Sequence, residues 1–263
     1  MTTVGDILNF VQTIAPVSMK MEWDHVGLNC GRQDKPVSKV LVALDPFDEA
    51  IEEAVSWGAE LLLTHHVLLY RPDFITDADT QGRRCLRLIE NGIAHINAHT
   101  NLDCAPGGVN DCLAAVLELQ DIQVVNPQGT DALGRPYGLL RMGTVTRQPL
   151  EHFLAHVKRT LGCSGLRFVS SGKPVHKVAV GGGSCGDFLQ EAMDAGCDTF
   201  VTADIKYNVF RDAYDAGMNL VEAGHFHTEA PVCRYLAAQL EAAFPALTVK
   251  ISENQGDPMN FFI

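Results

Sequence analysis

The chain has 263 residues, of which 46% are hydrophobic and 20% charged, and its 32 acidic and 20 basic residues give a formal net charge of −12. This composition is typical of a globular chain with one large or two ordinary domains and ample material for a buried core. No basic cluster is longer than Arg83–Arg84, which excludes a surface that follows a phosphate backbone, so we expect no nucleic-acid partner.

The N-terminus favours a first amphipathic helix over a targeting signal. Val4, Ile7, Leu8 and Val11 recur at helical spacing around Asp6, without the basic start and long apolar run of a signal peptide. No apolar run approaches the roughly 20 residues that span a bilayer. We therefore predict a cytoplasmic protein with no membrane contact.

The eight cysteines form no C-x-x-C pair and lie in otherwise apolar segments. Their spacing excludes a zinc finger or a disulfide scaffold and predicts reduced, packed thiols. Cys104 directly follows Asp103, so it is either another packed thiol or a reactive neighbour of a site.

Strand-like apolar runs alternate with helical patterns along the chain. The runs lie at residues 40–44, 60–64, 94–99, 177–182, 199–204 and 219–224. The helical patterns at 48–58 and 186–196 each close on a glycine, Gly58 or Gly196. This alternation predicts an α/β fold.

An internal repeat accounts for much of this pattern. Residues 39–66 align without a gap to residues 177–204, a constant shift of 138 positions. Seven aligned pairs are identical, and the apolar positions between them keep the same phase: Lys39/Lys177, Val40/Val178, Val42/Val180, Glu53/Glu191, Ala54/Ala192, Gly58/Gly196 and Thr64/Thr202. We therefore predict two related α/β domains that arise from one repeated unit.

The segment from about 124 to 176 links the two copies. It carries turn residues at Pro127, Gly129, Gly134 and Pro136, followed by a helical pattern at 151–162 and a strand pattern at 166–171. We predict a first domain at 1–125 and a second at 126–244. The C-terminal strand within 245–263 is a candidate to return to the first domain.

Histidines and carboxylates gather where the predicted strands end. His65 and His66 follow one strand, and two His-x-x-x-acid pairs, His99/Asp103 and His225/Glu229, end the two halves. Imidazole and carboxylate together suit divalent metals, and fourth-neighbour spacing places both groups on one side of a helical turn. Open α/β sheets bind ligands at these strand ends. Any one of these histidines, taken alone, fits a hydrogen-bonded core or surface residue equally well, but the joint pattern predicts a two-metal site.

Two weaker signals can each be explained by function or by local structure alone. Residues 181–186 satisfy G-x-G-x-x-G, which is typical of a phosphate-binding turn, but the equivalent turn at 44–48 has no glycine, which favours a tight turn from strand to helix. In the other signal, Asp24 or His25 beside Trp23 either supports the site or belongs to a turn that packs the indole.

Five motifs together resemble the Nif-three-like family, whose members carry the name of type 2 homologues of GTP cyclohydrolase I. They are WDHVGLNCG, LLLTHH, AHTNLDCAPGGVNDCLA, TADIK and GHFHTEAPV, in order through nearly the whole chain. The resemblance implies a Nif-three-like α/β fold, a dinuclear metal centre and a toroidal homohexamer.

Carried over residue by residue, the family pattern implies five metal ligands: His65, His66, Asp103, His225 and Glu229. His99 stands beside them. Many relatives have a histidine where this chain has Tyr207 and Asn208, so neither is assigned as a ligand, and His227 is an extra candidate outside the ligand set.

The functional hypothesis is a metal-dependent hydrolase acting on a nucleotide-like or other small substrate through a metal-bridging hydroxide. His99 and Glu229 are the candidate catalytic residues, with His99 or His227 shuttling protons in a cyclohydrolase reaction. Zinc, iron, manganese and nickel all suit the ligands, at two ions per chain. The alternative is a non-catalytic metal-holding ring that serves as a scaffold or binds a partner.

Overall fold

The computed structural model describes residues 1–70 and 72–262, and the chain divides into two compact units. Unit 1 comprises Met1–Ala105 and Val232–Gly256, and unit 2 comprises Pro106–Pro231 and Asp257–Ile263. The division lies about 20 residues before the predicted boundary at 125, and helix α10 (Pro231–Ala243) falls almost entirely in unit 1 instead of the second domain.

Two contacts explain these differences. Helix α5 (Val109–Val116) packs on strand β8 (Leu140–Gln148), and its Asp111 forms an ion pair of 2.9 Å with the buried Arg141. This contact ties the segment after residue 105 to unit 2. At the end of α10, the ring of Phe244 meets that of Phe10 in helix α1 (Val4–Ile14) edge to face at 5.4 Å, which ties α10 to unit 1.

Unit 1 is built on a five-stranded sheet of order β1-β4-β3-β2-β13. The strands are β1 (Gly27–Cys30), β2 (Lys39–Ala43), β3 (Leu61–Thr64), β4 (Ala94–Asn97) and β13 (Thr248–Ile251). All neighbours are parallel except β1, which pairs antiparallel with β4. The C-terminal strand thus joins the first sheet as expected, through its pairing with β2.

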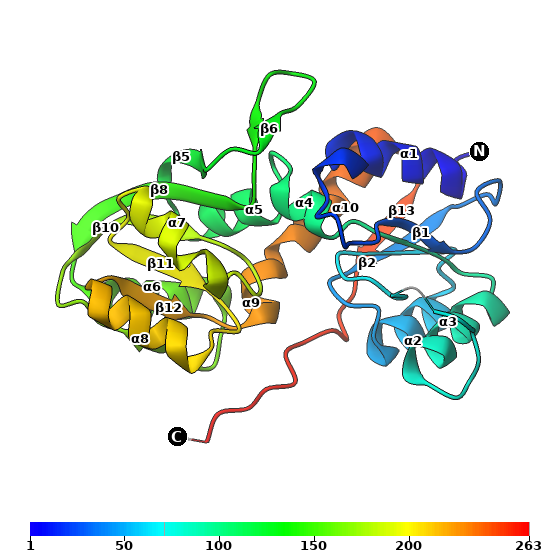
Figure 1. Cartoon of the computed structure of the whole chain (residues 1–263). Coiled ribbons are helices and arrows are strands. Elements are labelled where there is room, and N and C mark those ends of the chain that lie inside the picture. Colours follow the sequence, from blue (N-terminus) through cyan, green and yellow to red (C-terminus); the bar gives the residue numbers. More distant parts are fainter. Residues whose placement is uncertain (71, 263) are drawn as a thin grey trace. The chain divides into compact units, whose positions relative to one another are not determined.

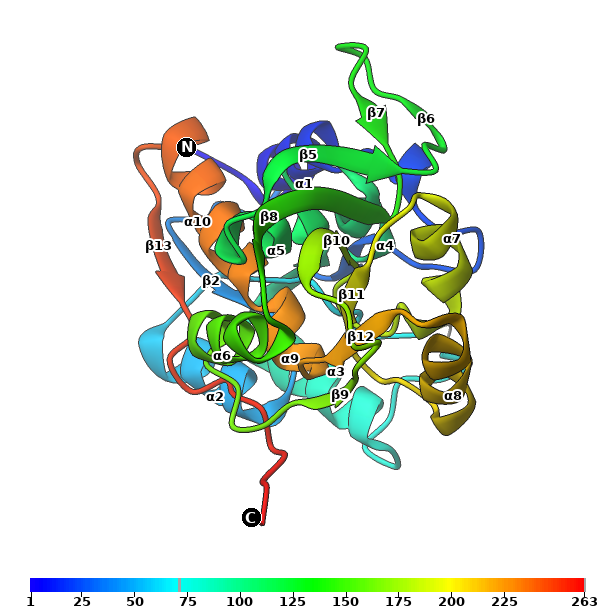
Figure 2. The same cartoon turned by 90° about the vertical axis from the view of Figure 1, so that its left-hand side faces the viewer.

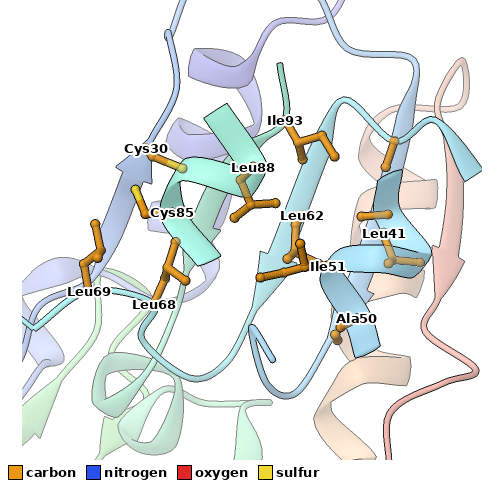
Figure 3. Close-up of a cluster of buried hydrophobic side chains, with 13 residues drawn as sticks. Cys30, Leu41, Ala50, Ile51, Leu62, Leu68, Leu69, Cys85, Leu88 and Ile93 are labelled. Carbon is orange, nitrogen blue, oxygen red and sulfur yellow. The ribbon is translucent and has the colours of Figure 1, made fainter. Parts of the chain in front are cut away.

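Helices cover both faces of this sheet (Figure 1). Helices α2 (Asp48–Trp57) and α3 (Thr80–Glu90) lie on one face, and α1 and α10 lie on the other. Figure 3 shows the core beneath α2 and α3, where Ile51 and Leu88 pack over Leu62 of β3. Burial on both faces explains why β3 reads as a continuous apolar run.

His95 is a fully buried histidine in β4. Its Nε2 lies 2.8 Å from Thr64 Oγ1, and burial lowers its pKa to about 3. The unfolded chain, with a histidine pKa near about 6.5, therefore binds one proton more than the folded chain between these two pH values. The stability that neutral His95 confers is complete above the unfolded pKa and is lost as pH falls below it.

We expect the free energy of unfolding to fall by about 1.4 kcal/mol per pH unit on account of this one histidine below about pH 6. Urea unfolding of the wild type and of His95→Gln at pH 5.0, 6.0 and 7.5 isolates its contribution, because glutamine does not titrate. Parallel pH profiles for the two proteins would contradict the prediction.

Unit 2 is built on a six-stranded sheet of order β5-β8-β10-β11-β12-β9. Its strands besides β8 are β5 (Gln120–Val125), β9 (Arg167–Val169), β10 (Val175–Val180), β11 (Thr199–Thr202) and β12 (Asn219–Glu222). A small hairpin of β6 (Gly129–Thr130) and β7 (Pro136–Tyr137) forms at the predicted turn residues. Turns, one helix and one strand were predicted between residues 124 and 176, and strand β8 was not.

The helices of unit 2 also form two layers (Figure 2). Helices α5 and α6 (Leu150–Leu161) pack on one face, with Phe153 fully buried against Val178 and Val201. Helices α7 (Leu189–Asp194) and α8 (Tyr207–Ala216) lie on the other face. The helix expected at 186–196 is shorter than predicted, because its first turn is a 3-10 helix at Gly186–Phe188.

The two sheets repeat one pairing at the predicted shift. In unit 1, β2 pairs with β3 with Val40 opposite Leu61, and in unit 2, β10 pairs with β11 with Val178 opposite Thr199. Both pairs are parallel. The α/β fold is confirmed, and this register agrees with the alignment of the two copies.

Among the helices within 1–70 and 72–262, none combines the length and the apolar character that crossing a membrane requires.

Candidate metal centre

Unit 1 gathers four candidate ligands at the carboxyl ends of two adjacent parallel strands. His65 and His66 directly follow β3, and His99 follows β4. Asp103 lies one helical turn further, in the short helix α4 (Thr100–Cys104). Because β3 and β4 run parallel, their ends meet at one edge of the sheet, as the sequence predicts.

The three imidazoles form a tight group. One ring nitrogen from each of His65, His66 and His99 lies within 4.8 Å of the other two. Asp103 joins them, with its Oδ1 3.5 Å from His65 Nε2. His65 and Asp103 are buried, whereas His66 and His99 are partly exposed. Three imidazoles and a carboxylate at this spacing form a donor set that suits zinc, iron, manganese or nickel.

Each of the three histidines is held at Nδ1 by an oxygen atom. His65 Nδ1 donates to the carbonyl oxygen of Ala98 (2.8 Å), His66 Nδ1 to Asp45 Oδ1 (2.6 Å) and His99 Nδ1 to Asp24 Oδ1 (2.9 Å). A proton fixed on Nδ1 leaves the lone pair on Nε2 for a metal. This hydrogen bond to the far ring nitrogen is the usual companion of a metal-ligating histidine.

Asp24, which bonds His99, accepts several further hydrogen bonds. It accepts hydrogen bonds from His99, from the backbone N–H and hydroxyl of Thr100 and from the backbone N–H of His25. Burial acts to raise its pKa, but the bonds from His99 and Thr100 outweigh burial and place the pKa well below its usual range. Asp24 therefore carries a charge that keeps His99 in one orientation, and of the two alternatives for this segment the structure favours support of the site.

Trp23 does not pack into a core as the alternative required. Its side chain is 60% exposed, and its ring meets that of His99 edge to face at 6.0 Å. Three backbone carbonyls around it accept hydrogen bonds from Lys20, which holds the turn in shape. An aromatic face thus stands beside the histidine group.

Unit 2 contributes the second pair, His225 and Glu229, on the short helix α9 (His225–Glu229) after β12. His225 Nε2 lies 3.1 Å from Glu229 Oε2, as the fourth-neighbour spacing predicts. His225 Nδ1 donates to Asp204 Oδ2 at 2.6 Å, so the same oxygen-to-Nδ1 arrangement recurs in this unit.

The glycine-rich turn after β10 shapes the space beside this pair. Gly183 has φ +64°, and a Cβ atom built on it would lie 2.1 Å from Glu229 Oε1 and 3.0 Å from His225 Nε2. Only glycine leaves the carboxylate in place. The turn is fixed, because Gly183 N–H donates to Thr228 Oγ1 at 3.0 Å and its carbonyl accepts from the Thr202 hydroxyl at 3.1 Å.

The same hydrogen bonds bear on the phosphate-binding alternative. The Gly182 N–H donates to Asn110 Oδ1, the Gly183 N–H to Thr228 and the Cys185 N–H to Thr202. A phosphate-binding turn needs these amides for its ligand. The structure therefore favours the tight-turn reading, with Gly183 as a cradle for Glu229.

The remaining candidates have other roles. His227 Nδ1 donates to the Leu161 carbonyl and its Nε2 faces Asp257, so it is held apart from the His225–Glu229 pair. Cys104 is fully buried, unlike a reactive thiol, which is usually partly exposed. Tyr207, which was not assigned as a ligand, has an 85% exposed side chain.

Sequence reasoning missed Asp45 and Asp204 as partners of the histidines. Asp204 stands at the position that aligns with His66 under the repeat shift. It follows Thr202 as His66 follows Thr64, so the alignment itself offered a signal for Asp204. Nothing in the alignment indicated Asp45, because its counterpart is Gly183.

Comparison with known proteins places this geometry in a family. The model of the family described as Duf34/NIF3 (NGG1p interacting factor 3) matches residues 2–258. The chain belongs to the Duf34/NIF3 family. The resemblance stated from the five motifs is thereby confirmed.

Relatives of known sequence and structure agree with this assignment. A Clostridium perfringens protein named "GTP cyclohydrolase 1 type 2 homolog" is 34% identical over 264 residues, covering 98% of this chain and 99% of its own. A Streptomyces coelicolor protein of the same name is 35% identical over 268 residues, with 98% and 94% covered. The crystal structure of a Bacillus cereus protein related to NIF3 matches 99% of both chains, with a TM-score of 0.91 and 25% identity.

Proposed function

We propose that this NIF3-family chain binds two divalent metal ions and uses them in hydrolysis. The observation that carries the proposal is the recurrent hydrogen bond to Nδ1. His65, His66, His99 and His225 each have Nδ1 bonded to an oxygen, so the far ring nitrogen, Nε2, is the one that each would present to a metal. Four core or surface histidines taken at random would not share this arrangement beside buried carboxylates.

We propose two ions per chain, held by the ligands that the family resemblance implies. Unit 2 offers one imidazole and one carboxylate, His225 and Glu229, which is too few for a stable site on its own. The other three ligands that the family resemblance implies are His65, His66 and Asp103, and the set of five would hold two ions. Zinc, iron, manganese and nickel all fit these ligands, and their availability selects among them.

Bound ions and protein side chains would have different roles in the hydrolysis. When bound, two divalent ions supply a water of lowered pKa and polarise the bond that is cleaved. The chain positions a proton carrier beside them, because Asp24 holds the proton of His99 on Nδ1 and leaves Nε2 to accept one from a reacting group. Gly183 leaves room for the Glu229 carboxylate.

A nucleotide-like substrate fits the exposed aromatic face. Trp23 stands beside His99 with more than half of its side chain exposed, and an exposed indole is a favourable surface for a purine ring. The relatives named as GTP cyclohydrolase 1 type 2 homologues make GTP the first nucleotide to test.

Glu229→Gln tests catalysis directly. We expect metal-loaded wild type to turn over GTP and the variant to lose at least about 100-fold in rate, because glutamine is a poor metal ligand. Glu241→Gln, an exposed change of the same kind on α10, is the matched control and should keep the wild-type rate. Equal turnover by the wild type and Glu229→Gln would contradict the cyclohydrolase mechanism. No turnover in any of the three would favour the scaffold alternative.

For the assembly, we propose the toroidal homohexamer that the family resemblance implies, in a cytoplasmic protein. Light scattering that gives a stable monomer would contradict the ring.

A further inference from the structure

Two thiols in the core of unit 1 lie side by side. Cys30 ends the edge strand β1, and Cys85 lies in the middle of helix α3. Figure 3 shows the Cys30 side chain directed toward helix α3 and the Cys85 side chain directed toward strand β1. We propose that Cys30 and Cys85 form a reversible intrachain disulfide, a redox modification site separate from the metal ligands.

The geometry of the two elements supports the bond. The two thiols interact directly, and a hydrogen bond between their side chains is the largest influence on the pKa of each. Helix α3 packs directly on β1. The ladder between β1 and β4 shifts register just before Cys30, and an irregular edge strand adjusts to a new bond more easily than a regular central strand.

The two thiols differ in acidity, as the partners in a reactive pair do. The hydrogen bond from Cys30 lowers the pKa of Cys85, although burial opposes this effect. The same bond, together with burial, raises the pKa of Cys30. Cys85 is therefore the sulfur that loses its proton first. Because it is fully buried, it attacks an oxidant when helix α3 opens locally from β1, and Cys30 is the resolving thiol.

The reaction balances with hydrogen peroxide as the oxidant. The Cys85 thiolate attacks one peroxide oxygen, the O–O bond breaks, and a sulfenic acid and one water form once the leaving hydroxide takes a proton. The Cys30 sulfur then attacks the Cys85 sulfur, the S–O bond breaks, and the second water leaves with the Cys30 proton. Two electrons pass from the two sulfurs to the peroxide. A disulfide such as oxidised glutathione accepts the same two electrons by exchange and leaves as two thiols.

The disulfide would affect the region that follows His65 and His66 through hydrogen bonds of strand β1. Next to Cys30, the Asn29 side chain accepts a hydrogen bond from the Leu68 N–H at 3.1 Å and donates one to Asn97 Oδ1 at 2.8 Å. Leu68 follows His65 and His66, and α3 begins after the same connection. A disulfide would tie β1 to α3 and constrain the unfolded chain between residues 30 and 85.

Peptide mapping of the whole protein tests the proposal. The protein is equilibrated overnight in glutathione buffers from reducing to oxidising, quenched in acid, alkylated and digested with trypsin. Cleavage after Lys20, Arg32, Arg84 and Arg87 places the two cysteines in peptides 21–32 and 85–87. We expect these peptides to appear joined in oxidising buffer and separate in reducing buffer, with the other six thiols still alkylated.

Variants separate the pair from general thiol oxidation. Cys30→Ala and Cys85→Ala should each abolish the joined peptide. Cys112→Ala should retain it, because Cys112 lies in α5 of unit 2, is partly exposed, and has its S–H bonded to the Gly107 carbonyl. The wild-type map decides the question even if a core variant folds poorly. The proposal is overturned if all eight thiols are alkylated in every buffer, if another pair is joined, or if oxidation stops at a single glutathione adduct.

Discussion

Gly183→Ala is expected to abolish stoichiometric metal binding without removing any ligand. A methyl group at this position would lie 2.1 Å from Glu229 Oε1 and 3.0 Å from His225 Nε2, both well inside van der Waals contact. The turn cannot retreat, because Thr202 and Thr228 hold Gly183 at both its carbonyl and its N–H. The carboxylate must move instead, and we expect the affinity for zinc or manganese to fall at least about 100-fold.

Titration against a chromophoric chelator measures this effect, and two control variants isolate its cause. Gly162→Ala has the same left-handed backbone, with φ +69° and no atom within 4 Å of the added methyl group, so it reports the cost of strain alone. Gly186→Ala lies in the same turn as Gly183, with its nearest atoms at 3.8 Å. Both controls should bind metal as the wild type does. Wild-type affinity in Gly183→Ala would show that Glu229 is not a ligand.

The sequence predicted the parts of the fold that carry strong periodicity. Runs such as Leu61–Leu63 are apolar at every position because helices cover both faces of the sheet, and the helix at Asp48–Trp57 ends on Gly58 in the left-handed conformation. Strand β8 was missed because its pattern is mixed. Its last three residues, Thr146–Gln148, are polar and partly or fully exposed.

The domain boundary was misplaced for a similar reason. Turn residues after 125 suggested a linker, but the chain passes between units nearer residue 105, where Asp111 and Arg141 form an ion pair. No local pattern reveals a contact between residues 30 positions apart. The return of α10 to unit 1 likewise depends on tertiary packing, as in the contact of Phe244 with Phe10.

The candidate ligands were predictable, and the groups that hold them were only partly so. Imidazole and carboxylate at strand ends are visible as residue types, so His65, His66 and His99 could be named together. Their oxygen partners come from other elements: Asp45 precedes α2, and Asp24 precedes β1. Only the folded backbone brings these pairs together, although Asp204 was within reach of the repeat alignment.

The central proposal is that the chain binds two divalent ions through the five ligands that the family resemblance implies, and metal content tests it most directly. Plasma mass spectrometry on tag-free protein, prepared without chelator and reconstituted with zinc or manganese, should find close to two ions per chain. His65→Ala removes a ligand of unit 1 and Glu229→Ala removes one of unit 2, so metal content should fall in both variants. Glu241→Ala, an exposed change in α10, should retain the wild-type content. Wild-type metal content in either ligand variant, or no bound metal in the reconstituted wild type, would contradict this ligand set.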